Sequence, residues 1–181
     1  GRPWLEREHY DRLRRSLNEL QFEPYAIDTL MDRSRETIEA GGVQEGTLYI
    51  QISRGVAPRA HAFPNPPVPP TEVILVRPYD DAGTDSLRES GASAISHPDL
   101  RWKRCDIKTT NLLGNVLAIQ AARRSGATEA ILFDDDGIVT EATHSSVLWA
   151  RNGTLSGTPE GNEILPGLTR RFVEPLAASA G

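Results

Sequence analysis

The chain has 181 residues, of which 38% are hydrophobic and 25% are charged, and its formal net charge is −5. This composition is typical of a globular protein with a buried core, and it argues against nucleic-acid binding because no basic stripe could neutralise phosphates. No apolar run of about 18 residues and no leader-like segment occurs, so neither a membrane span nor a secretory signal is predicted. A single cysteine, Cys105, excludes an internal disulfide framework and fits a reducing cytoplasm.

The first part of the chain alternates helix-like and strand-like segments. Residues 7–20 and 25–42 carry apolar side chains three and four positions apart, which predicts two amphipathic helices, the second ending at a Gly-Gly pair. Residues 48–53 and 71–79 are rich in β-formers, which predicts two strands separated by a proline-rich loop.

A polar, turn-rich stretch near the middle of the chain, DDAGTDS (residues 80–86), is the best candidate for a linker. It predicts a small N-terminal α/β lobe over residues 1–80, a linker over residues 81–87 and a larger lobe over residues 88–181.

The second part of the chain mixes strands, hairpins and helices, which predicts an α+β fold in two lobes. Strands are expected at residues 92–96, 101–108, 129–134 and 138–143, a hairpin at 145–157, and helices at 116–126 and 165–177. Cys105 falls in the second of these strands, where we interpret it as a small apolar filler.

Lysine is rare in this chain, because only Lys103 and Lys108 are lysines among 20 basic residues. Lys108 is expected at the end of a strand, where a turn begins and a side chain can reach into a cleft. Unlike arginine, a deprotonated lysine forms Schiff bases with carbonyl compounds. Lys108 is therefore the candidate nucleophile, with an ordinary surface lysine as the alternative.

Glu141 follows an apolar pair in a probable strand, so its carboxylate is expected to be partly buried and to require a cation or a hydrogen-bond donor. A protonated pyridine nitrogen would be such a partner, and the pairing would keep a cofactor ring electron-withdrawing. An exposed strand glutamate is the alternative interpretation.

Two further groups of residues suggest anion binding. Arg59 and His61 point the same way in an extended loop, where a guanidinium and an imidazole could hold a substrate carboxylate. The segment PGLTRR places Thr169 at a helix N-terminus, a natural phosphate site, and Arg12 in the first helix is a second phosphate candidate. The acidic run DDDG lacks the spacing of a calcium loop, so we interpret it as a hairpin turn and expect no metal.

These segments occur in the order found in a known family. The chain resembles the fold-type IV, pyridoxal-phosphate-dependent aminotransferases, and among them the D-amino-acid branch. The resemblance runs nearly from end to end, and its most specific stretches are YIQISRGVAPRAHAFP and RWKRCDIKTTNLLGN.

The resemblance implies a role for each candidate. Lys108 would be the Schiff-base lysine and Glu141 the partner of the pyridine nitrogen of pyridoxal 5′-phosphate. Arg12 would bind the cofactor phosphate, with Leu168 and Thr169 adding backbone and hydroxyl contacts.

The resemblance also implies a homodimer, because in this family the residues corresponding to Arg59 and His61 hold the substrate α-carboxylate in the other subunit's site. The lobe over residues 88–181 would be the cofactor-binding lobe.

The sequence departs from the family pattern in several places. The family's N-terminal strands, with an active-site tyrosine, and the C-terminal part of its cofactor lobe lie outside these 181 residues. Ser146 stands where the family usually has asparagine, and His144 replaces a small residue.

The resulting hypothesis is ping-pong transamination between a D-amino acid and a 2-oxo acid, with the Lys108 amine as the general base. Alternatives on the same scaffold are a branched-chain L-amino-acid aminotransferase and an aminodeoxychorismate lyase. A further alternative is a non-catalytic relic that binds the cofactor or a partner protein without turnover.

Overall fold

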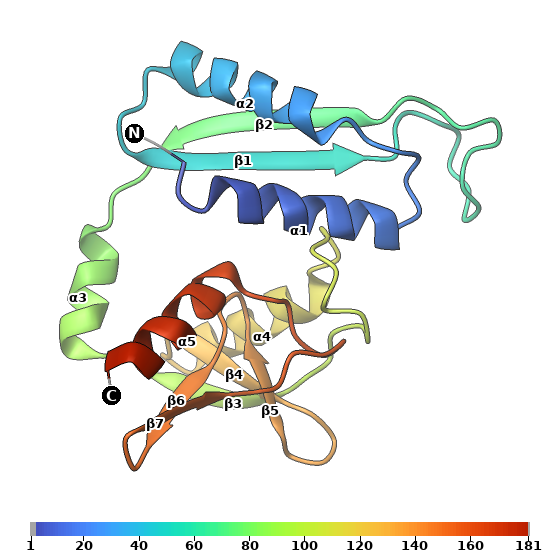
Figure 1. Cartoon of the computed structure of the whole chain (residues 1–181). Helices are drawn as coiled ribbons and strands as arrows, with labels where there is room; N and C mark the ends of the chain where they lie inside the picture. The colour runs from blue at the N-terminus through green and yellow to red at the C-terminus, as the bar shows by residue number, and fades with distance from the viewer. Residues whose placement is uncertain (1–2, 181) are drawn as a thin grey trace. The chain divides into compact units, whose positions relative to one another are not determined.

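The computed structural model describes residues 3–180, except for the side chain of Ala180 (Figure 1). The described chain divides into two compact units. The first contains residues 17–83 with Pro3 and Trp4, and the second contains residues 5–16 with the chain from Thr84 onward. The boundary after Gly83 falls within the segment expected to be a linker. Residues 5–16, which were expected in the first lobe, group with the second unit.

The first unit is built on a two-stranded antiparallel sheet. Strands β1 (Gly46–Ser53) and β2 (Thr71–Pro78) pair in register from Gly46 opposite Pro78 to Ser53 opposite Thr71. Helix α2 (Ile27–Gly41) packs on β2 and buries Leu30 completely. These elements agree with the predicted helix and strands.

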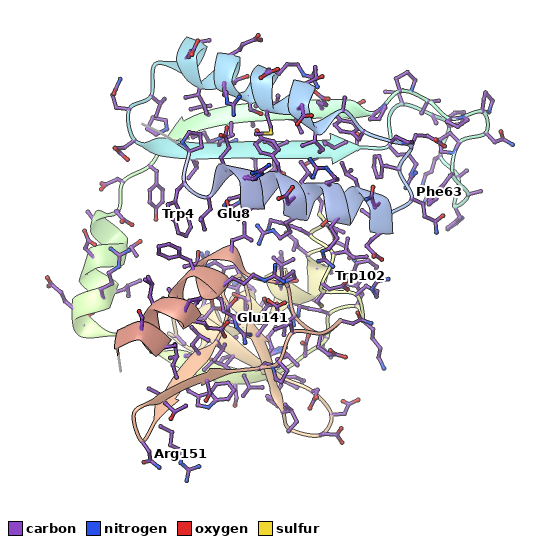
Figure 2. All side chains as sticks on the ribbon, viewed as in Figure 1. Trp4, Glu8, Phe63, Trp102, Glu141 and Arg151 are labelled. Carbon is purple, nitrogen blue, oxygen red and sulfur yellow. The ribbon has the colours of Figure 1, made fainter. Side chains whose placement is uncertain are left out.

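The loop over residues 54–70 joins β1 to β2 and is anchored at its start by Arg54. The Arg54 guanidinium lies 4.4 Å from the ring centre of Phe22 and 3.6 Å from that of Phe63, which Figure 2 labels in this loop. The same guanidinium donates hydrogen bonds to the backbone oxygens of Leu20 and of Gln21, the latter at 3.1 Å. The Arg54 side chain therefore ties the loop to the end of the first helix.

The second unit contains a three-stranded sheet in the order β3–β4–β5. Strands β3 (Ala94–Pro98) and β4 (Glu129–Phe133) are parallel and are joined through α4 (Leu113–Arg124). Strand β5 (Val139–Ala142) pairs antiparallel with β4. The core of this layer is made by small residues of α4 and by β4, which let the helix approach the sheet closely: Ala118, Ala122, Ala130 and Leu132.

Three helices and a hairpin complete the second unit. Helix α1 (Glu6–Glu19) contributes residues up to Ser16, and α3 (Ala82–Ser90) leads into β3. Strands β6 (Leu148–Arg151) and β7 (Thr154–Gly157) form an antiparallel hairpin, and α5 (Leu168–Ala180) packs against β7. No helix within residues 3–180 has both the length and the apolar surface that spanning a membrane requires.

Two predicted segments differ in the structure, and in both cases local polar contacts explain the difference. The expected linker is largely the helix α3, in which Asp80 accepts the Ala82 N–H at 3.0 Å and Asp85 pairs with Arg88 one turn later. The segment 101–108 forms turns and no strand.

The turns of this segment arise because its charged side chains bond back to neighbouring groups. Asp99 Oδ1 accepts the Arg101 N–H at 3.1 Å, and Arg104 Nε donates to Asp106 Oδ1 at 2.9 Å. Cys105 is consequently half-buried in a turn, where its thiol donates to the Trp102 carbonyl, and it does not lie in a buried strand. Lys108 likewise follows a turn segment and does not end a strand.

Candidate active site

A cavity of about 820 Å³ lies in the second unit and collects most of the candidate residues. We call it the Lys108 cavity. Its walls come from α1, the turn segment after β3, α4, β5 and the start of α5, and they include the residues His9, Arg12, Arg101, Trp102, Cys105, Lys108, Asn115, Glu141, His144, Ser146, Gly167, Leu168 and Thr169. Its volume is in the range of cavities that hold small-molecule ligands and cofactors.

Lys108 is fixed to α1 through its backbone, because its N–H donates to Ser16 Oγ at 3.1 Å. Its side chain is exposed, but it lines the cavity wall, where protein atoms replace part of the water around the amine. This burial, together with the positive charge of Arg12, lowers the pKa of Lys108, and the charge of Glu141 opposes the effect only in part. The amine is thus neutral, and able to act as a nucleophile or base, at lower pH than an ordinary lysine.

Glu141, which Figure 2 labels, lies on β5. It is 8% exposed. Its Oε2 accepts a hydrogen bond from Arg101 Nη1 at 2.5 Å, and its Oε1 accepts the Leu165 N–H at 3.3 Å. Burial raises the pKa of Glu141, and this outweighs the lowering by Arg101 and Leu165. The side chain is therefore a buried acceptor at the cavity wall, as expected from the sequence.

Arg101 and Asp99 form a second buried charge pair that the sequence did not reveal as part of the site. Arg101 Nε and Nη2 donate to the two oxygens of Asp99 at 2.9 and 2.8 Å, and Thr140 Oγ1 donates to Asp99 Oδ2 at 2.6 Å. Arg101 is close to Lys108 in the sequence, but nothing there indicated that Arg101 or Asp99 would contact Glu141. The feature of the sequence that could have indicated this pair is an aspartate two residues before an arginine, directly after a short strand.

Arg12 and the N-terminus of α5 lie close together, and both can bind an anion. Arg12 Nη1 donates to the Pro166 carbonyl at 3.2 Å, which places the guanidinium next to the helix N-terminus. Leu168 is buried, Thr169 is exposed, and both line the cavity. The first N–H groups of a helix have no partner within it and attract anions. Burial, followed by the charges of Arg15 and Arg171, lowers the pKa of Arg12, so a bound anion would stabilise this region.

The backbone before α5 comes close to the loop after β5. A Cβ atom at Gly167 would lie only 2.5 Å from Ser146 Oγ, so a larger residue there would force the Ser146 hydroxyl to move. Ser146, noted as a departure from the family pattern, therefore packs against the helix N-terminus at the cavity wall.

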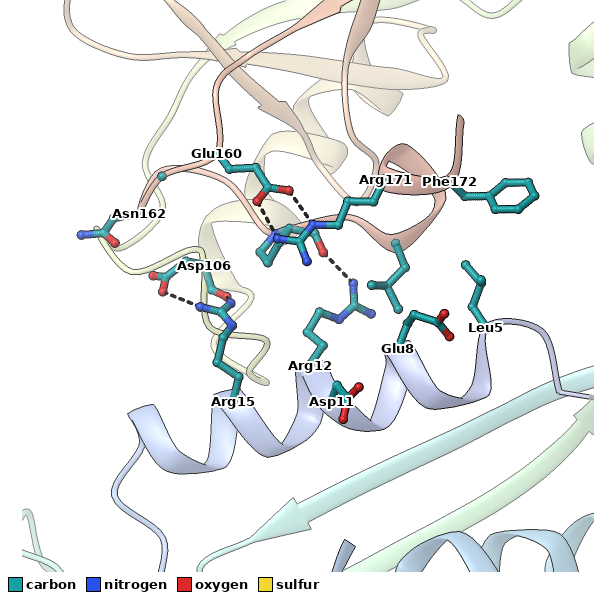
Figure 3. A pocket seen from close by; sticks show the side chains of 13 residues that line it. Leu5, Glu8, Asp11, Arg12, Arg15, Asp106, Glu160, Asn162, Arg171 and Phe172 are labelled. Carbon is teal, nitrogen blue, oxygen red and sulfur yellow. Dashed lines mark hydrogen bonds and ion pairs between the residues drawn. The ribbon is translucent and has the colours of Figure 1, made fainter. Parts of the chain in front are cut away.

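A second cavity of about 680 Å³ shares Arg12 and Leu168 with the first (Figure 3). Figure 3 shows its other two arginines already paired with carboxylates. Arg171 binds Glu160 through two hydrogen bonds of 2.7 and 2.5 Å, and Arg15 donates to Asp106 at 3.3 Å. Because these charges are neutralised internally, the cavity offers a weaker anion site than the Lys108 cavity.

Arg59 and His61 are exposed residues of the loop 54–70 in the first unit, outside the set of residues that line the Lys108 cavity.

In the acidic turn, Asp134 Oδ1 accepts the N–H groups of Asp136 and Ile138 at 3.0 and 2.8 Å, as expected for a hairpin turn. Among the residues described, no cluster of three histidine, cysteine or acidic side chains is arranged to hold a metal ion.

Comparison with curated proteins yields relatives named D-alanine aminotransferase. The relative from Staphylococcus epidermidis is 40% identical over 178 residues, which are 98% of this chain and 62% of the relative. The relative from Bacillus licheniformis is 35% identical over 175 residues, which are 96% of this chain and 60% of the relative. The chain thus spans about three fifths of the length of the curated relatives it matches.

Solved structures confirm the expected α+β fold. The branched-chain amino acid aminotransferase of Escherichia coli has a TM-score of 0.85 at 24% identity, covering 97% of this chain and 60% of that one. A hypothetical aminotransferase from Mycobacterium tuberculosis, in a form with α-ketoglutarate and PMP bound, has a TM-score of 0.84 at 23% identity over 100% and 65% of the two chains. A family model described as amino-transferase class IV matches residues 1–181, and with this full-length match and these relatives the chain belongs to the class IV aminotransferase family.

Proposed function

We propose that this chain carries the catalytic machinery of a pyridoxal-phosphate-dependent aminotransferase that moves an amino group between a D-amino acid and a 2-oxo acid. The observation that carries the proposal is that Lys108, Glu141 and Arg12 line one cavity, although they come from three separate segments. The relatives named D-alanine aminotransferase, at 40% identity over 98% of this chain, support the choice of D-amino acids.

The residues of the Lys108 cavity fit pyridoxal phosphate. Arg12, the N-terminus of α5 and the Thr169 hydroxyl provide a phosphate site, and Leu168 adds a backbone contact there. Glu141 provides a buried carboxylate for the pyridine nitrogen, and Lys108 provides an amine for the aldehyde. When bound, the cofactor would supply an aldehyde that condenses with amines and a protonated ring that withdraws electrons from the substrate.

The residues of the chain would then do three things. Glu141 keeps a proton on the ring nitrogen by offering it a buried negative charge. Arg12 and the α5 terminus fix the phosphate and so the orientation of the ring. The Lys108 amine would remove the proton from the Cα of the amino acid as a general base, and the resulting ammonium would return a proton as a general acid. The first keto acid leaves before the second substrate binds, which is a ping-pong order.

Substrate recognition is assigned to Arg59 and His61, which would hold the α-carboxylate through the guanidinium and the imidazole. In the proposed homodimer these residues serve the site of the partner subunit. The proposal includes a small lobe over residues 1–80, a cofactor-binding lobe over residues 88–181, and a location in the cytoplasm.

The two lysines allow a direct test. The purified protein is mixed with pyridoxal phosphate, reduced with borohydride and digested, and the modified peptide is identified by mass spectrometry. We expect the label on Lys108 and its loss in Lys108→Ala. The control Lys103→Ala changes the other lysine and should label as the unchanged protein does.

A coupled assay then determines the substrate class. With 2-oxoglutarate as acceptor, D-alanine should yield pyruvate, whereas L-valine should give no keto acid. Turnover of L-valine alone would instead indicate a branched-chain aminotransferase. Labelling of Lys108 without turnover of either amino acid would favour a non-catalytic relic, and the absence of any label would reject the proposal.

A further inference from the structure

The carboxylate of Glu141 belongs to a connected buried network. Arg101 bridges it to Asp99, and the side chains of Arg101, Asp99 and Glu141 are only 6%, 11% and 11% exposed. The Arg101 guanidinium donates to both acids and, through Nη2, to the Glu163 carbonyl at 2.8 Å. With four bonds to three partners, it is held in one orientation.

The other side of Arg101 is held by α4. A Cβ atom at Gly114, in the first turn of that helix, would lie 3.1 Å from the N, Cα and Cγ atoms of Arg101. Asp99 is held in turn by the Thr140 hydroxyl at 2.6 Å, from the residue next to Glu141 on β5. The backbone and the partner of Arg101 are therefore both fixed by the scaffold.

The charges of this network do not cancel. Two carboxylates share one guanidinium, so Asp99, Arg101 and Glu141 together carry one net negative charge when all are ionised. Asp99 takes two of the hydrogen bonds of Arg101 and leaves a single one for Glu141. Glu141 thus keeps acceptor capacity, since an ionised carboxylate has about four lone-pair sites.

We propose that Asp99 and Arg101 are positioning residues that set the charge and orientation of Glu141, so that the wall of the Lys108 cavity presents one uncompensated negative charge to a cationic ring N–H. Arg101 favours the ionised form of Glu141 and so opposes the effect of burial. Asp99 neutralises Arg101 and so prevents it from saturating Glu141. The proposal rests on the proposed function only for the identity of the cation.

Two other titratable side chains lie near Glu141. Lys108 interacts with the charge of Glu141, which opposes the lowering of the Lys108 pKa by burial and by Arg12. Burial raises the pKa of Cys105 to about 11, so near neutral pH its thiol adds no charge. Burial alone would raise the pKa of Asp99, but the hydrogen bonds from Arg101 and Thr140 outweigh it and keep that acid ionised. Against the raising effect of burial, Arg101 lowers the pKa of Glu141 and Asp99 raises it, so these two charged side chains adjust its ionisation.

The test follows the Glu141 carboxyl itself in the cofactor-free protein. Glutamate labelled with ¹³C at Cδ is incorporated, and the Glu141 resonance is identified by its absence in Glu141→Gln. A pH titration gives its midpoint in each variant. Because no cofactor is present, the result is independent of whether the chain catalyses transamination.

We expect Arg101→Met to raise the midpoint by at least about one pH unit, because an adjacent opposite charge and its hydrogen bond are lost. Arg101→Lys should give a smaller increase. Asp99→Asn should lower the midpoint, because Arg101 then has only Glu141 as an ionic partner. The matched control Arg104→Met removes a cation of the same segment that pairs with Asp106 and should leave the midpoint unchanged.

Each outcome decides the question. An unchanged midpoint in folded Arg101→Met, judged by its amide spectrum, overturns the proposal. If that variant does not fold, Asp99→Asn decides alone, since the charge remaining at Arg101 must lower the midpoint of Glu141. A midpoint that stays constant or rises in Asp99→Asn overturns it.

Discussion

The two units of the molecule use charge in opposite ways. In the second unit, charged side chains are buried and bonded to one another around the Lys108 cavity, as in the pair of Arg101 with Glu141. In the first unit, Arg59 and His61 lie exposed on a loop, and Arg54 at the base of that loop is stacked on aromatic rings. Buried pairs suit chemistry that needs shifted pKa values, whereas an exposed loop on an anchored base suits recognition.

The largest expected effect concerns the Lys108 cavity of the second unit, where we place the chemistry. Lys108→Ala should reduce the transaminase rate by about 10³-fold or more, because the nucleophile and general base are removed together. Steady-state rates with D-alanine measure this. Lys103→Ala should retain the original rate, and a comparable loss in that variant would show that Lys108 has no special role.

The next prediction concerns the loop 54–70 of the first unit, where we place substrate recognition. Arg59→Gln should raise KM for the D-amino acid by about tenfold to a hundredfold, the value of a charge-assisted hydrogen bond, while labelling of Lys108 by the cofactor is unchanged. Arg151→Gln removes an exposed arginine of the β6–β7 hairpin and serves as the control. Loss of cofactor labelling in Arg59→Gln would contradict the separation of roles.

Arg54 is expected to act on the loop through stability. Arg54→Met removes two cation–π contacts and leaves the carbonyls of Leu20 and Gln21 without this donor, which should lower the free energy of unfolding by about 1–2 kcal/mol. Urea unfolding measures the change. If Arg54→Met leaves both the urea midpoint and the KM for the D-amino acid unchanged, the loop does not depend on Arg54.

The smallest effect concerns pH. Hydrogen bonds from Arg104 hold the pKa of Asp106 below its usual value, against a smaller opposing effect of burial. A carboxyl whose pKa is lowered by folding stabilises the protein above its unfolded pKa, and this contribution is lost as the pH falls through the folded value. Asp106→Asn should therefore lower the free energy of unfolding by about 1 kcal/mol at neutral pH, where the carboxyl is ionised, and leave it unchanged at a pH below the folded-state pKa. Urea unfolding at these two pH values measures the difference. An equal loss of stability at both would contradict this origin.

Most of the helices and strands could be predicted from the sequence because their periodicity is local. Two segments could not, since the turns at 101–108 and the helix at 82–90 depend on which polar side chains bond to neighbouring groups. Hydrophobic patterns alone do not encode that choice.

The candidate site shows the same division. The sequence by itself singled out Lys108, because an amine among arginines has distinct chemistry, and Glu141, because a carboxylate in an apolar strand needs a partner. Only the tertiary structure decided that this partner includes Arg101, 40 residues earlier in the chain, and that Arg12 lies beside the start of α5. Such contacts depend on how distant elements pack, and packing places charges that no local pattern can position.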